Sequence, residues 1–217
     1  MGNKPIELTA FFFIIRAIEG IVVYGLLLFF GLRFAKKIGI RFLLLDKSAN
    51  LKNDLFVPGL NIGTLCAFIL LFVDKLLPVS SLSLNAFAKG IPPLYGLLGA
   101  IFGVIQEEVI LCLVCISGFA LLFKKIFRHV GMSVIMWISI LFVAVLFGIC
   151  HLPTFIHEIS STTAPLIAQI LILNAICSIT FGLLFWRKGF ETAIFAHFVT
   201  NFIICFLFPL SLYLGFF

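Results

Sequence analysis

Six long apolar runs dominate the chain of 217 residues and limit what it can fold into. A helix needs about 20 apolar residues to cross the hydrocarbon layer of a membrane, and each run is long enough. The chain is 63% hydrophobic and only 11% charged, which excludes an ordinary soluble domain. We therefore predict an all-α fold, a polytopic transmembrane helix bundle that forms one domain over residues 1–217. The predicted spans cover residues 9–35, 58–78, 95–123, 131–152, 164–186 and 190–215.

Two features leave the number of membrane segments open. The third run is long enough to contain a break, for which Gly99 and Gly103 are the candidates. The segment 80–96, with the sequence SSLSLNAFAKGIPPLYG, can enter the membrane again without crossing it. A bundle of about six spans would then hold seven or eight segments.

Basic residues predict how the bundle is oriented. The net charge is +6, and most basic residues lie in the short loops after the first, third and fifth spans. Such loops face the cytoplasm in most membrane proteins, so we expect both termini on the opposite side. Because the basic residues lie in the loops between spans, the positive charge is explained by membrane topology. We therefore expect the lipid bilayer, and no nucleic acid, as a partner. The default location is a bacterial plasma membrane, in which the protein would be integral and multi-pass.

Five polar side chains are predicted at one level of the membrane. Counted at about 1.5 Å per residue from the basic loops, Glu107 and Glu108 lie about 25 Å from the cytoplasmic edge. His151 reaches a comparable depth, and His197 and Asn201 reach about 14 and 20 Å. One buried histidine is ordinarily a packing residue, but an ionisable group costs roughly 2.5 to 3.5 kcal/mol at this depth. Five polar residues from three helices therefore indicate a functional site.

Spacing within the helices predicts which of these side chains face the same way. His197 and Asn201 are four residues apart, so they lie on one face of their helix. Glu107 and Glu108 are about 100° apart around the helix axis, so we expect that they cannot both point at one spot. One carboxylate would then face the chemistry while the other makes a structural hydrogen bond.

Three short motifs on successive helices carry these residues. They read EEVILC from residue 107, FGICH from residue 147 and HFVTN from residue 197. Phe147 and His151 belong to the second motif. In this order the motifs resemble those of the CPBP intramembrane protease family, also called Abi, which includes the type II CAAX prenyl endopeptidase and has the patterns EExxxR, FxxxH and HxxxN. The resemblance covers about residues 95–205, which would form the protease-like core.

The resemblance implies an intramembrane endopeptidase that hydrolyses a peptide bond in a membrane-anchored or apolar peptide substrate. Glu107 would take a proton from the attacking water, and His151 would orient that water. His197 and Asn201 would donate hydrogen bonds to the oxyanion that develops on the carbonyl. Glu108 would not contact the substrate and would instead position the residues that do.

A bound metal stays open at this stage. The family is often labelled as metalloproteases, and zinc could be held by Glu107, His151 and His197. The chain lacks an HExxH pair on one helix, however, and the same residues suit a metal-free mechanism.

One position departs from the family pattern. Cys112 stands where the first motif has its arginine, so that motif lacks a cation one turn from the glutamates. A nearby cation favours the ionised carboxylate, and a general base must be ionised to work. An alternative prediction is therefore a catalytically impaired family member that acts as a membrane scaffold or immunity protein. A third is a proton-coupled carrier in which the glutamates relay protons, although the spans show no inverted repeat.

Overall fold

The computed structural model describes the backbone of residues 4–77, 92–158 and 163–215, and the side chains of residues 18–77, 92–153 and 163–215. Within these ranges six helical segments are long and apolar enough to cross a membrane, which confirms the predicted six-span bundle. The described part of the predicted re-entrant segment, from Pro93, belongs to a membrane helix, and residues 78–91 lie outside the described residues.

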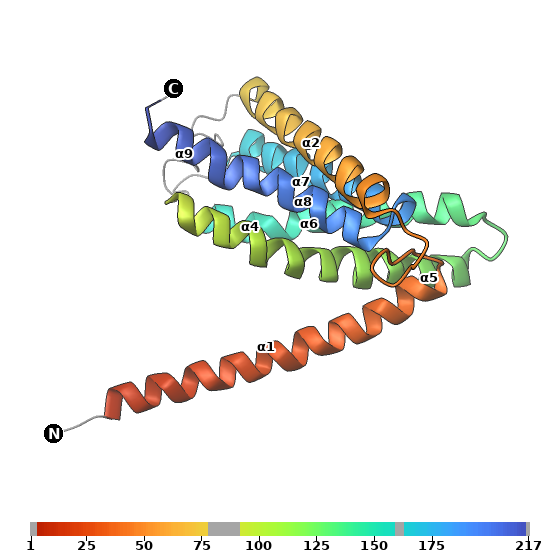
Figure 1. Ribbon diagram of the computed structural model, residues 1–217, viewed down its shortest axis with the longest axis horizontal. Helices are drawn as coiled ribbons and strands as arrows, with labels where there is room; N and C mark the ends of the chain where they lie inside the picture. Colours follow the sequence, from red (N-terminus) through yellow and green to blue (C-terminus); the bar gives the residue numbers. More distant parts are fainter. Residues whose placement is uncertain (1–3, 78–91, 159–162, 216–217) are drawn as a thin grey trace.

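The regular structure is helical throughout the described ranges (Figure 1). The α-helices are α1 (Lys4–Lys37), α2 (Val57–Leu76), α4 (Pro93–Glu108), α5 (Ser117–Ile126), α6 (Met132–Glu158), α7 (Ala164–Arg187), α8 (Phe190–Asn201) and α9 (Phe208–Tyr213). Three segments with the wider π-helical turn continue or precede them: η1 (Lys52–Phe56), η2 (Val109–Ile116) and η3 (Phe202–Leu207).

The irregular turns of two spans lie directly after the predicted site residues. The expected break near Gly99 or Gly103 is wrong, because α4 runs through both glycines and the change of geometry begins at Val109. In the last span the π-helical turn η3 begins at Phe202. A π-helical turn changes the direction in which the following side chains point, and such turns are frequent at functional sites. The first motif therefore contains a change of helix geometry, and the third motif ends directly before one.

Small residues let the last span, α8 together with η3, pack closely against two neighbouring helices. A side chain at Gly63 of α2 would meet the carbonyl oxygen of Ala196, and one at Gly96 of α4 would meet that of Cys205 in η3. The Thr200 hydroxyl also donates a hydrogen bond of 2.9 Å to the Gly63 carbonyl. This close approach holds the helix that carries His197 in the centre of the bundle (Figure 1).

Helix α1 leaves the bundle along most of its length (Figure 1). It contacts the bundle near its C-terminal end, where Gly31 packs against Leu113 of η2. A Cβ atom added at Gly31 would lie 2.7 Å from Cβ of Leu113. Farther from this contact its apolar side chains are exposed, with Ile21 at 73%. Such a surface suits contact with lipid, as expected of a membrane span.

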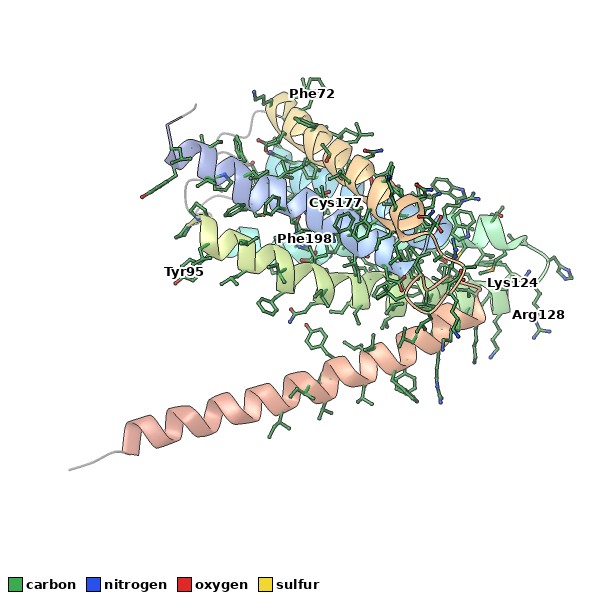
Figure 2. The ribbon with its side chains drawn as sticks, viewed as in Figure 1. Phe72, Tyr95, Lys124, Arg128, Cys177 and Phe198 are labelled. Atoms are coloured by element: carbon green, nitrogen blue, oxygen red, sulfur yellow. The ribbon has the colours of Figure 1, made fainter. Side chains whose placement is uncertain are left out.

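The basic loops gather at one end of the molecule. Helices α1, α5 and α7 all end there (Figure 1), and Figure 2 shows Lys124 and Arg128 at this end and Tyr95 and Phe72 at the other. The loop after α1 is fastened to the start of α8, because the Glu191 carboxylate accepts hydrogen bonds of 3.0 Å from two of its backbone N–H groups. The arrangement matches the predicted alternation of loops.

Candidate active site

A cavity of about 230 Å³ lies among the helices that carry the three motifs. Side chains of α2, α4, α6, α7, α8 and η3 form its wall. Five of the seven residues predicted from the sequence line it, whereas Glu108 and Cys112 do not. The five are Glu107, Phe147, His151, His197 and Asn201.

His197 lies between the two glutamates. Its Nδ1 is 2.8 Å from Oε1 of Glu108, and its Nε2 is 3.6 Å from Oε2 of Glu107. The Phe181 ring stacks on the imidazole, with 4.3 Å between the ring centres and 17° between the planes. Both carboxylates thus contact the same imidazole, but at its two different nitrogens and not at one spot.

The two glutamates differ in exposure. The side chain of Glu107 is 34% exposed and forms part of the cavity wall, whereas that of Glu108 is 1% exposed. The second carboxylate oxygen of Glu108, Oε2, is buried without a hydrogen-bond partner. A group that takes a proton from water must be reachable by water, and in this geometry Glu107 is the reachable carboxylate.

His151 and Asn201 also contribute polar groups to the wall. Nδ1 of His151 is 2.9 Å from the carbonyl oxygen of Phe147, one turn earlier in α6. Because a carbonyl only accepts, Nδ1 carries a proton, and in the neutral imidazole Nε2 then keeps its lone pair. The side-chain amide of Asn201 makes no hydrogen bond to any other described residue, so its N–H groups are available to a ligand.

Cys112 lies in the core, one turn beyond Glu108. It is 2% exposed and, with Ser178 and Phe181, surrounds a narrow space beside Glu108 and His197. Within the described residues, both glutamates form ion-pair contacts with His197 only. His197 is therefore the side chain in direct contact with both carboxylates.

The proposed zinc ligands do not form a metal site in this geometry. A zinc ion would need Glu107, His151 and His197 to converge on one point. The nitrogens of His197 are instead directed at two carboxylates, and no group of three His, Cys, Asp or Glu side chains in the described ranges is arranged to hold a metal. We therefore derive no step through a metal ion.

Sequence reasoning missed the polar residues that α7 contributes to the cavity. Gln169 and Asn174 both line it, and Gln169 donates a hydrogen bond of 2.8 Å to Asp74 of α2. A glutamine and an asparagine inside an apolar run are the signal that was available. Attention to ionisable groups alone left this helix out of the predicted site.

Comparison with known families identifies the chain. The family profile described as Type II CAAX prenyl endopeptidase Rce1-like matches residues 89–203, just over half of the 217 residues. The chain belongs to this Rce1-like family. The matched range includes all three motifs and agrees with the resemblance stated from the sequence. Searches among curated proteins and among solved structures found no match. The Rce1-like chain is thus an integral, multi-pass membrane protein of a protease family.

Proposed function

We propose that this Rce1-like protein is an intramembrane endopeptidase in which Glu107 activates a water molecule for attack on a peptide bond. The observation that carries the proposal is a cavity within the membrane-spanning bundle whose wall contains Glu107, His151, His197 and Asn201. A carboxylate, two imidazoles and a carboxamide around one space provide proton acceptors and hydrogen-bond donors for hydrolysis.

The water would be held by two acceptors. The Glu107 carboxylate takes its proton, and the lone pair on Nε2 of His151 accepts its other hydrogen. A water bound in this way directs an oxygen lone pair away from both groups and toward a carbonyl in the cavity. His151 thus orients the nucleophile while Glu107 acts as the general base. Glu107 then gives the proton taken from water to the leaving amine as the C–N bond breaks.

The developing oxyanion would be bound by donors from α8. The N–H groups of Asn201 can serve this role directly, and His197 can serve it when Nε2 carries a proton. Glu108 accepts from Nδ1 of His197 and, together with the stacked Phe181 ring, keeps the imidazole in place. Glu108 is therefore a positioning residue.

The cavity wall also indicates the class of substrate. Beside the polar groups it consists of apolar side chains, including Leu70, Ile170, Leu173 and Ile204. A peptide with apolar side chains, anchored in or lying against the membrane, would enter this space at the lowest cost of desolvation. A charged peptide would leave its charges unpaired there.

A cleavage assay tests the proposal. The purified protein in detergent is given a quenched fluorescent library of apolar peptides, with and without a chelator. We expect cleavage by the wild type and a loss of at least about 100-fold in Glu107→Gln, since a general base contributes roughly 10²- to 10⁴-fold. The matched control is Gln106→Ala, because Gln106 is the exposed neighbour on the same helix. Equal rates in Glu107→Gln and wild type would contradict the role of Glu107.

The neutral residue at position 112 favours a second candidate, a non-catalytic scaffold. Cys112 is buried beside Glu108, and His197 alone forms ion-pair contacts with the glutamates within the described part of the chain. Cleavage by Cys112→Arg, together with no cleavage by the wild type, would support this candidate. Cleavage by the wild type would exclude it.

A further inference from the structure

A buried polar pair connects α2 and α7 at the end of the bundle opposite the basic loops. Nε2 of Gln169 donates a hydrogen bond of 2.8 Å to Oδ1 of Asp74. Gln169 is 0% exposed and Asp74 is 8% exposed. Asp74 lies one turn beyond Leu70, which lines the cavity, and Gln169 is itself part of the cavity wall. The pair therefore lies beside the space that contains Glu107.

The contact with Asp74 determines which way the Gln169 amide points. Since Asp74 accepts from the nitrogen, the amide oxygen Oε1 is the atom left over, and it is buried without a partner. A buried acceptor without a donor costs about 1 to 3 kcal/mol, and such atoms are rare in folded proteins. If Gln169 only joined the two helices, its Oε1 would not need to be buried without a donor. The unused acceptor indicates a donor that arrives with a ligand.

The distance along α7 relates Gln169 to the reacting groups. Cys177 is eight residues farther along, about 12 Å at 1.5 Å per residue, and also lines the cavity. One turn beyond it, Phe181 stacks on His197. An extended peptide rises about 3.3 Å per residue, so about four residues cover the same distance. A peptide whose scissile bond lies level with Cys177, which lines the same cavity as Glu107, would thus pass Gln169 about four residues away.

We propose that Gln169 is a substrate-positioning residue whose Oε1 accepts a backbone N–H of the substrate about four residues from the scissile bond. A backbone N–H is the donor that every peptide except one with proline at that position brings, whatever its side chains. Asp74 keeps the amide oriented for this contact. The inference rests on the proposed peptidase function and adds that the substrate lies extended along α7, toward the end of the bundle that carries no basic loop.

The test combines an enzyme variant with a change in the substrate. Each amide of a cleaved peptide is replaced in turn by an ester, which removes one N–H and keeps the shape. For the wild type we expect one ester, about four residues from the cleaved bond, to reduce kcat/KM about tenfold, mainly through KM. Gln169→Met has no acceptor, so the same ester should change its kcat/KM less than twofold. Gln169→Glu keeps an acceptor oxygen and, with one proton shared with the Asp74 carboxylate, its orientation, so it should retain the dependence.

Two controls separate this inference from a general effect on folding or on activity. Each enzyme is compared with itself on the amide peptide, so a smaller folded fraction cancels. Asn174→Leu alters another residue of the cavity wall, whose amide donates to the Ile170 carbonyl of its own helix, and should keep the dependence of the wild type. Equal ester effects in the wild type and Gln169→Met would overturn the inference and leave the peptidase standing.

A binding measurement decides the case in which nothing is cleaved. A fluorescent ten-residue leucine–alanine peptide and its ester series are then bound to the Glu107→Gln protein, with and without Gln169→Met. One ester that weakens binding about tenfold only when Gln169 is present supports the contact even though the proposed activity has failed. The absence of any such ester overturns it.

Discussion

Glu107 and Glu108 are adjacent in the chain and lie in different surroundings. Glu107 faces the cavity, whereas Glu108 is buried against Nδ1 of His197. The same imidazole therefore connects a reachable carboxylate with a buried one. At the scale of the residue, function and stability should depend on different members of this set.

Removal of the buried carboxylate should destabilise the protein more than a change at the cavity. Glu108→Leu leaves the buried Nδ1–H of His197 without an acceptor, at a cost of about 1 to 3 kcal/mol. Glu107→Gln replaces a partly exposed group by one of similar size, and its effect should stay within about 0.5 kcal/mol. Thermal unfolding in detergent measures both. A larger loss of stability in Glu107→Gln than in Glu108→Leu would contradict this assignment.

Asp46 should make the loop after α1 sensitive to acid. Hydrogen bonds from Ser48 and from Arg41 lower the pKa of Asp46 from its ordinary value of 3.8 to about 2. Because the unfolded loop binds the proton more tightly, this stabilisation is complete above about pH 3.8 and is lost as the pH falls through about 2. Hydrogen exchange of the Ser48 amide, which donates to Asp46 at 2.9 Å, should accelerate over this range relative to its intrinsic rate. Asp46→Asn should show no such acceleration.

At the scale of the element, close helix packing positions the proposed catalytic groups. Helix α8 carries His197 and Asn201 and approaches α2 where the latter has Gly63. The π-helical turns η2 and η3 begin directly after Glu108 and Asn201. The positions of these side chains therefore depend on backbone contacts that lie outside the three motifs.

A methyl group at Gly63 should disturb this packing. Gly63→Ala places a Cβ atom against the Ala196 carbonyl and 2.8 Å from Cβ of Val199, so α2 and α8 must separate. We expect a loss of about 1 to 3 kcal/mol in stability, typical of overpacking, together with reduced activity. Gly99→Ala is the matched control, because no atom lies within 4 Å of its Cβ position, and it should be neutral or stabilising by up to about 1 kcal/mol. Thermal unfolding in which both variants behave alike would exclude the packing argument.

At the scale of the whole molecule, the basic loops and Gln169 lie toward opposite ends of the bundle. The basic loops follow α1, α5 and α7, whereas Gln169 lies near the start of α7. If the basic end faces the cytoplasm, a substrate extended along α7 reaches the site from the outer half of the membrane. Orientation thus decides which peptides can meet the site.

Labelling of introduced cysteines tests the orientation. Lys47→Cys lies in the exposed loop after α1, and Thr163→Cys lies exposed before α7. A membrane-impermeant maleimide should label Thr163→Cys in intact cells and Lys47→Cys only after the cells are opened. The wild type corrects for the six native cysteines. The reverse pattern would place the site in the cytoplasmic half.

The amino-acid sequence by itself determined the number of spans and the candidate site. Apolar runs of membrane length predict helices because a helix satisfies every backbone group within its own segment. Rare polar residues inside such runs, as in the motifs around Glu107, His151 and His197, indicate a site because burial of such groups is costly. Both signals are local, so they are visible without the fold.

Only the tertiary structure decided which of these residues face the cavity and which contact another side chain instead. The angle between adjacent helical residues could not show that Glu107 and Glu108 reach the two nitrogens of His197, because long side chains and neighbouring helices determine that contact. The Gln169–Asp74 pair joins residues 95 positions apart, so it depends on the packing of α2 against α7. Contacts of this kind arise from the close approach of helices, which apolar periodicity does not encode.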